Sequence, residues 1–276
     1  MAWRIFRRHR QAVLGLGLMS ILCLSAVLTP YLAPYDPDAQ GDIVATRYQP
    51  PSLSHPMGTD RFGRDVLSRV LYGARISLSI GFSAVLIAIS LGTLVGAVAG
   101  YERGWWDSLS MRFVDLLLSF PRLVLLITVV AFFQPSIALV TIVLGLTGWM
   151  GTSRIVRGEV LSIREREFVL AARALGFRDR RILLRHVLPN ALSPVIVAAT
   201  LGIGNTILAE AALSFLGLGV QPPTASWGNM VASGRDAMLQ AWWVAAFPGL
   251  AIVLTVMSFN LVGDGLRDAL DPRSSA

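Results

Sequence analysis

Ionisable side chains occur at only a few positions inside the apolar stretches of this sequence, and these residues are the ones most capable of chemistry. Arg112 and Asp115 lie three residues apart in one stretch, so on a helix they would share a face and could form an ion pair. Arg122 directly follows Pro121 in the same stretch, and Glu210 lies in a later one. Because a charge in hydrocarbon is costly, each residue marks either a transport pathway or a helix contact.

Whether a transport pathway or a helix contact is favoured differs among these ionisable residues. Pairing with each other is favoured for Arg112 and Asp115 over a role in a gate. A kink at Pro121 would turn Arg122 toward the interior of a helix bundle, where lining a pathway and forming a structural pair are equally open.

A second group of polar and small residues lies in the later stretch, NTILAEAALSFLGLG and the residues before it. Glu210, toward its outer end, would contact a substrate amine or form a salt bridge with a partner subunit. Gly202, Gly204 and Asn205 suit close helix packing, so an interface is favoured there over a binding site.

The sequence has no pattern typical of an enzyme or of a metal site. Cys23 is the only cysteine, which excludes a disulfide framework and a cysteine metal cluster. The histidines His9, His55 and His186 are scattered. Lysine is absent, so the Walker A motif, which ends in Gly-Lys-Ser/Thr, is absent too. We therefore expect a protein that is not an enzyme and that binds no cofactor itself.

Composition indicates the elements that position these residues. Of 276 residues, 54% are hydrophobic and 15% are charged, against roughly 25% charged in a soluble domain. Lipid offers backbone groups no partners and the alternation of a barrel is missing, so the fold class is an all-α membrane protein. Six transmembrane helices are predicted near Ala12–Leu32, Ile76–Gly100, Leu109–Phe133, Ser136–Thr152, Ala191–Phe215 and Trp242–Gly263.

Arginine distribution predicts the orientation of these spans. Six spans put both termini on one side, and 17 of the 24 basic residues fall on that side, which is therefore expected to be the cytoplasm. The net charge of +7 is explained by this asymmetry, so nucleic acid is not expected as a partner. An uncleaved first span is favoured over a signal peptide, because the apolar run is long for one.

The sequence divides into three parts. Residues 1–32 form a basic cytoplasmic N-terminus and the first span, and 33–75 form an outer (periplasmic) loop. Residues 76–276 form a five-helix core with a cytoplasmic loop at 154–189. In the outer loop Thr59 or Asp60 would cap an amphipathic surface helix, because Phe62, Val66 and Val70 recur at four-residue spacing.

The cytoplasmic loop contains the charged block EFVLAARALGFRDRRILLRHVLPN. Ser162 and Glu165 have capping-box spacing, which predicts a helix up to Leu175 that Gly176 would end in a left-handed conformation. A second short helix is predicted from Asp179 to Val187, before Pro189 opens the next span. The preceding segment, 149–163, is predicted to be one continuous rod.

The first of these helices carries an apolar face. Phe168, Ala172 and Leu175 share it, and the small residues Ala171, Ala172 and Gly176 would let another backbone approach closely. The alternative is a pair of amphipathic helices at the headgroups, with their arginines on anionic lipid.

The stretch LAARALGFRDRRILLRHVLP resembles the loop of permease subunits in binding-protein-dependent ABC importers. The family pattern is Glu-Ala-Ala, three residues, Gly, nine residues, Ile, one residue, Leu-Pro; Leu170 and His186 replace its Glu and Ile. HPMGTDRFGRDVLSRVLYGARISL, SFLGLGVQPPTASWG and FNLVGDGLRDALDP resemble the second permease subunit of the dipeptide, oligopeptide and nickel importers. The similarity covers nearly the whole chain.

This resemblance implies a type I ABC importer permease fold, with a coupling helix between spans four and five that docks into an ATPase subunit. It implies as partners a homologous second permease, two ATPases that hold ATP and Mg²⁺, and a periplasmic substrate-binding protein, in a bacterial inner membrane. The coupling residues would be Glu167, Phe168, Ala171, Ala172, Arg173, Leu175, Gly176, Leu188 and Pro189.

A peptide is the first expectation for the substrate, and nickel, a nickel chelate or a glutathione-like compound is the alternative. An ion-coupled secondary carrier is less favoured, because Asp115 and Glu210 do not pair by depth.

Overall fold

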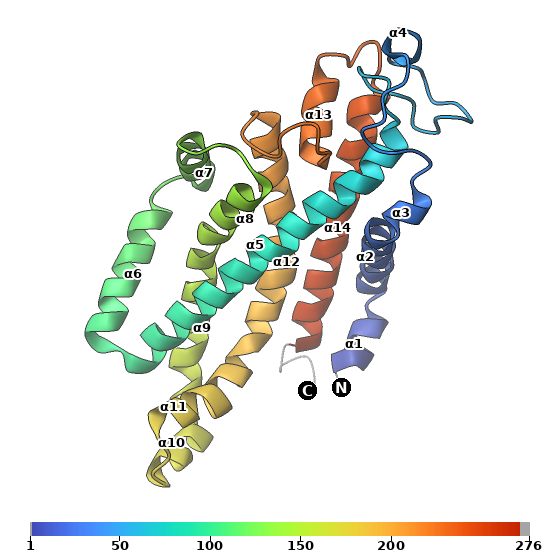
Figure 1. The fold of residues 1–276 in the computed structure, drawn as a ribbon. Helices are drawn as coiled ribbons and strands as arrows, with labels where there is room; N and C mark the ends of the chain where they lie inside the picture. The colour runs from blue at the N-terminus through green and yellow to red at the C-terminus, as the bar shows by residue number, and fades with distance from the viewer. Residues whose placement is uncertain (1, 271–276) are drawn as a thin grey trace.

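The computed structural model describes residues 2–270, and this part of the chain is helical with irregular connections. Five of its helices are long and apolar enough to cross a membrane, and there are six spans if one bent pair counts as a span. The predicted all-α class is therefore confirmed, and six spans agrees with the second of these counts. Figure 1 shows the long helices side by side, with the short helices gathered at the two ends.

The helices run in chain order as follows: α1 Ala2–Arg8, α2 Arg10–Val27, α3 Thr29–Leu32, α4 Ile43–Thr46, α5 Val66–Glu102, α6 Gly104–Leu118, α7 Arg122–Ala131, α8 Ile137–Leu146, α9 Trp149–Ile163, α10 Glu167–Ala174, α11 Asp179–Ile182, the π-helical turn Leu183–Val187, α12 Leu188–Phe215, α13 Trp227–Arg235 and α14 Trp243–Leu270. Two pairs are nearly continuous, so that 137–163 forms one span and Asp179–Phe215 another.

The central helix α5 packs most closely on α9, and glycines make this approach possible. A Cβ atom at Gly92 would lie 2.6 Å from the Thr152 Cβ, and one at Gly100 would lie 2.9 Å from the Arg157 carbonyl oxygen. Gly96, between them, faces the Ser153 carbonyl in the same way. Small residues four apart therefore let two backbones meet, which is how membrane helices usually gain contact.

The third span is broken into α6 and α7, which meet at an angle of 84°. Pro121 precedes α7 and cannot donate a backbone hydrogen bond, so the helix is interrupted there, as the sequence predicts. In Figure 1, α6 stands apart from the other long helices. It is held by ion pairs with α9 that are described below.

The outer end is covered by the 33–65 loop, α4 and α13. The predicted surface helix capped by Thr59 or Asp60 is wrong, because α5 begins at Val66, with Asp65 as its N-cap, and continues through the membrane without a break. The domain boundary at residue 75 therefore falls inside a helix. Asp60 instead accepts a hydrogen bond from Arg64 Nε at 2.8 Å.

Buried charges fix the outer loop onto the start of α5. Arg69 donates to the Pro37 carbonyl at 2.9 Å and to Asp38 at 3.0 Å, and the Asp65 carboxylate accepts from the Ser68 amide and hydroxyl, each at 2.8 Å. Because each of these charges is matched by a partner, their burial is tolerated. The loop is thereby joined rigidly to the second span.

The opposite end of the bundle holds the N-terminal helix and the tip formed by α10 and α11 (Figure 1). Phe6 and Ala12 pack against Val262 and Ala269, so α1 and α2 lie on the last turns of α14. The N-terminus, residue 270 and the α10–α11 tip therefore share one end, as an even number of spans requires.

Candidate coupling surface and intramembrane polar residues

The α10–α11 tip is carried on α9, which runs unbroken from Trp149 to Ile163, as the sequence predicts. The predicted capping box is wrong, because Ser162 still belongs to α9, and α10 begins at Glu167 after Arg166 as its N-cap. Helix α10 therefore begins about one turn later than the Ser-x-x-Glu spacing suggests, and a tight turn separates the rod from the tip.

Gly176 ends α10 in the predicted left-handed conformation, with φ at +77°. The Gly176 amide donates to the Arg173 carbonyl at 3.0 Å, and the Phe177 amide donates to the Ala172 carbonyl at 3.2 Å. This pair of bonds is a Schellman motif, which satisfies the last carbonyls of a helix and favours glycine. A Cβ at Gly176 would meet open space, so only backbone conformation requires glycine here.

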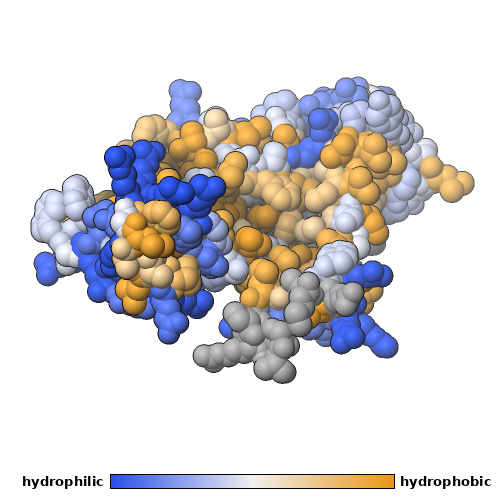
Figure 2. Space-filling view, turned by 90° about the horizontal axis from the view of Figure 1, so that it is seen from below, coloured by the Kyte–Doolittle hydropathy of each residue, from blue (hydrophilic) through white to orange (hydrophobic). Residues whose placement is uncertain are grey.

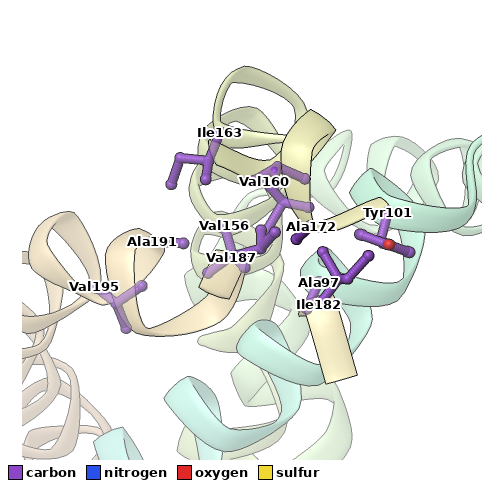
Figure 3. Close-up of a cluster of buried hydrophobic side chains, with 11 residues drawn as sticks. Ala97, Tyr101, Val156, Val160, Ile163, Ala172, Ile182, Val187, Ala191 and Val195 are labelled. Carbon is purple, nitrogen blue, oxygen red and sulfur yellow. The ribbon is translucent and has the colours of Figure 1, made fainter. Parts of the chain in front are cut away.

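One side of α10 is buried against its own chain. Val169 and Ala172 lie in a cluster with Tyr101, Val160 and Ile182. Figure 3 shows Ala172, Val160 and Val187 converging from different helices. The predicted face of Phe168, Ala172 and Leu175 is therefore only partly right, because Ala172 packs inward and serves close approach within this chain.

The other side of α10 is apolar and exposed. Phe168 is 42% exposed, Leu170 46% and Leu175 74%, and the small side chains of Ala171 and Ala174 lie between them. Exposed basic side chains surround this patch: Arg166, Arg173, Arg178, Arg180, Arg181 and Arg185. Figure 2 shows the tip from below as an orange patch within blue. We call it the tip patch: Phe168, Leu170, Ala171, Ala174 and Leu175.

Polar contacts hold the tip in place relative to α5. The Tyr101 hydroxyl donates to Asp179 at 2.6 Å, and Arg103 pairs with Glu165 at 2.5 Å. A hydrogen bond with the Tyr101 hydroxyl raises the pKa of Arg173, so this guanidinium keeps its charge. The tip is thus fixed to two spans and moves with them.

The second exit from the tip differs from the prediction. Asp179 does start a helix, but this helix passes through the π turn 183–187 into α12 without a break. The wider π turn accommodates Pro189, which lacks an amide hydrogen, and the Asn190 side chain donates to the His186 carbonyl at 2.6 Å. Leu188 packs against the tip's core cluster, while Pro189 is exposed.

Asp115 pairs with Arg154 of α9, so its predicted pair with Arg112 is wrong. About two turns nearer the N-terminal end of α6, Asp107 accepts from Arg157 at 2.5 and 2.7 Å. Arg112 is exposed and makes no ion pair with the residues that the structure describes. The charges on α6 therefore fasten it to the rod that carries the tip.

Glu210 is fully buried inside the chain, at 0% exposure. Its Oε1 atom accepts from the Ser214 hydroxyl at 2.7 Å and from the Ser226 hydroxyl at 3.0 Å. Because Ser226 caps α13, the carboxylate joins α12 to this outer helix. Both interpretations of Glu210 from sequence, a substrate contact and a salt bridge to a partner, are therefore wrong. Asn205 is exposed on α12, and its role stays a prediction.

Two features of the structure were not predicted from the sequence. Helix α13 lies in the outer loop between α12 and α14, and the signal for it was Ser226 three residues before Asn229, which form a capping box. The contact of the glycines 92, 96 and 100 with α9 was also not predicted, although their four-residue spacing is visible in the sequence.

A cavity of about 660 Å³ opens between α9, α12 and α14 toward the tip end, lined among others by Glu159, Arg166 and Arg267.

Comparison with known proteins identifies the family. Residues 92–276 match the binding-protein-dependent transport system inner membrane component, and residues 1–51 match the N-terminal transmembrane domain of oligopeptide transport permease C. The chain belongs to this permease family. The permease is 43% identical over 99% of its length to the dipeptide transport system permease protein DppC of Alkalihalophilus pseudofirmus, covering 89% of that protein. It is 47% identical over 98% of its length to the glutathione transport system permease protein GsiD of Escherichia coli, covering 89% of it.

A solved structure shares the fold of the permease. Inward-facing MetNI methionine ABC transporter matches with a TM-score of 0.61 at 19% identity, over 75% of this chain and 96% of that chain. The resemblance stated from sequence is thus confirmed, and the permease is a multi-pass inner membrane component, not an enzyme. Membership of a binding-protein-dependent ABC family implies ATPase and binding-protein partners.

Proposed function

We propose that this permease imports short peptides, di- or oligopeptides or glutathione, delivered by a periplasmic binding protein. The support is its identity of 43% and 47% to permeases named for dipeptide and glutathione transport, each over nearly the whole chain. With a homologous second permease it forms the translocation pathway, to which this chain contributes half.

The tip patch is the surface that receives the ATPase. Soluble surfaces rarely expose clustered large apolar side chains unless they bind a partner, and here they sit on a protruding tip ringed by arginines. The alanines at its centre leave room for a partner's side chain. The basic rim fits a groove with acidic edges, because opposite charges speed and orient association.

Force passes from the tip to the membrane through α9. The tip is packed onto α9, and α9 lies against α5 at backbone contact along three glycines. A displacement of the tip therefore moves two spans together. The ATPase drives this change only if it binds the tip differently in its two nucleotide states.

Transport in sealed vesicles tests this function. Proteoliposomes that hold the permease, its ATPases and the second permease should take up radiolabelled dialanine from loaded binding protein when ATP is inside. Uptake should persist when a protonophore collapses the proton gradient and stop without ATP. Uptake that follows the proton gradient instead would refute the proposal and favour a secondary carrier.

A matched pair of variants tests the tip patch. Replacing exposed Leu175 with aspartate should release the ATPase during purification, because it places a charge in the apolar contact. Replacing Leu184, an apolar residue outside the patch that is 52% exposed, with aspartate should leave the complex intact. The same loss from both variants would mean that the patch is not the specific contact.

The tip and both termini face the cytoplasm in this proposal, because most arginines lie at that end. In a variant that lacks Cys23, a single cysteine at Leu175 should react with a membrane-impermeant maleimide in inverted vesicles and not in intact cells. Labelling in intact cells would reverse the orientation.

A further inference from the structure

Arg122 is a charged residue within a membrane span, and it has no acidic partner among the residues that the structure describes. It makes no ion pair with the residues described, 2–270, and its one contact is a long hydrogen bond, 3.5 Å, from Nη2 to the Leu144 carbonyl. On the same span Asp107 and Asp115 each pair with an arginine of α9, and Arg112, like Arg122, makes no ion pair with the described residues. Arg122 therefore carries an uncompensated positive charge.

The guanidinium lies inside the membrane, not at its edge. Leu144 is the eighth residue of α8, so at about 1.5 Å per residue its carbonyl lies roughly 10 Å along the helix from the outer end. The side chain reaches toward this carbonyl and toward Gly148, where a Cβ would lie 3.6 Å from Nη2. It therefore points into the space between the broken span and the α8–α9 span, in the outer half of the membrane.

This position excludes contact with hydrocarbon. A lipid-facing arginine at this depth is strongly disfavoured, and broken helices are tolerated in membranes only where they are buried in protein or line a watery cavity. Arg122 is exposed on its open side and begins α7 directly after the break. That open side must therefore face the pathway or a partner subunit.

We infer that Arg122 binds the carboxylate of the transported peptide, and this inference rests on the proposed function. A free peptide brings a carboxylate in every transport cycle and removes it again, so the charge is matched only when cargo is present. The neighbouring exposed side chains Phe120, Leu123 and Val124 are apolar. A single charged group within an apolar wall is the usual design of a ligand site, where it fixes orientation.

The planar guanidinium suits this ligand, because it can donate two parallel hydrogen bonds to a carboxylate. The first amides of α7 add to the positive potential, since Pro121 provides no side-chain cap there. These amides alone would not specify a ligand. The charge of Arg122 does, because no acidic side chain within 2–270 offsets it.

The test compares dialanine with dialanine amide in the complete transporter. Uptake is measured per loaded binding protein, with the loading of each peptide determined separately. Wild type should import dialanine about tenfold or more faster than the amide, the size expected for hydrogen bonds to a charged group. Arg122→Gln should lose about tenfold of dialanine uptake and leave amide uptake unchanged, so the ratio approaches one.

Two further variants separate this role from others. Arg122→Lys, which keeps the charge but not the paired donors, should retain part of the preference. Arg75→Gln removes an exposed arginine at the outer end of α5 that makes no ion pair with the described residues, and it should leave both uptake rates unchanged.

Several results would overturn the inference. If Arg122→Gln slows both peptides equally, or neither, the residue does not read a carboxylate. If it releases the second permease during purification, Arg122 pairs with that subunit's acid. If Arg75→Gln removes the preference instead, the carboxylate binds there. All three leave ATP-driven peptide import standing, whereas a wild type that imports neither peptide from loaded binding protein refutes the proposed import of dipeptides.

Discussion

Replacing Gly176 isolates the geometry of the coupling tip from its contacts. The residue has φ at +77°, and a Cβ there would touch nothing, so a substitution changes only the backbone preference. Holding a residue with a Cβ in this conformation costs roughly 1–2 kcal/mol, and more for a β-branched one. A free-energy cost of about 1.4 kcal/mol changes an equilibrium constant about tenfold. If the native end of α10 is only marginally stable, Gly176→Val should therefore reduce its population by tenfold or more.

Two variants serve as controls for this prediction. Gly176→Asn should behave almost like wild type, because asparagine tolerates the left-handed conformation. Gly158 is an exposed glycine on α9 that also faces open space, but its backbone is helical. Gly158→Ala should therefore raise the free energy of unfolding by about 0.5–1 kcal/mol. The assay measures ATPase that co-purifies with the permease, and dialanine imported per ATP hydrolysed in proteoliposomes.

The pattern among the variants decides the matter. Gly176→Val should lose ATPase association or lower peptide per ATP about tenfold, while membrane insertion and the other two variants stay normal. Normal coupling in Gly176→Val would show that the tip's end geometry is not used. Equal damage from valine and asparagine would show that the side chain's bulk, not the backbone, matters.

Three further predictions concern the packing and the polar contacts between helices. Gly92→Ala should lower the free energy of unfolding by about 1–3 kcal/mol, because its Cβ would lie 2.6 Å from Thr152. Gly202→Ala should not lower it, because a Cβ there would lie 3.6 Å from its nearest neighbour. Thermal unfolding in nanodiscs measures both variants. Glu210→Leu should lower the free energy of unfolding by about 1–3 kcal/mol in the same assay, because it leaves the buried hydroxyls of Ser214 and Ser226 without an acceptor. Full stability in that variant would contradict the role of Glu210 in joining α12 to α13. Asp107→Asn should destabilise α6 by about 1 kcal/mol and Asp115→Asn by less than about 0.5 kcal/mol, because the first carboxylate is 14% exposed and the second 58%. Hydrogen exchange of the α6 amides measures both losses. A larger loss of protection in Asp115→Asn than in Asp107→Asn would contradict this order.

Sequence alone determined the features that depend on short stretches of chain. Composition requires membrane helices, because a bilayer leaves the backbone no other way to satisfy its polar groups. Pro121 breaks the third span, Gly176 ends α10, and Trp149–Ile163 forms a rod, since each follows from residue conformation and helical spacing within one segment. The family resemblance is similarly contained in the order of residues in a few blocks.

Only the tertiary structure decided which helix lies opposite each side chain. Asp115 is as close in sequence to Arg112 as an ion pair needs, yet it pairs with Arg154, because the folded bundle places α9 beside α6. Residue type and local sequence do not distinguish Ala172 and Glu210 from exposed residues, but packing against other helices buries both. Helical periodicity defines neighbours along one helix, whereas partners across helices depend on how the whole bundle closes, and a single segment contains no information about that.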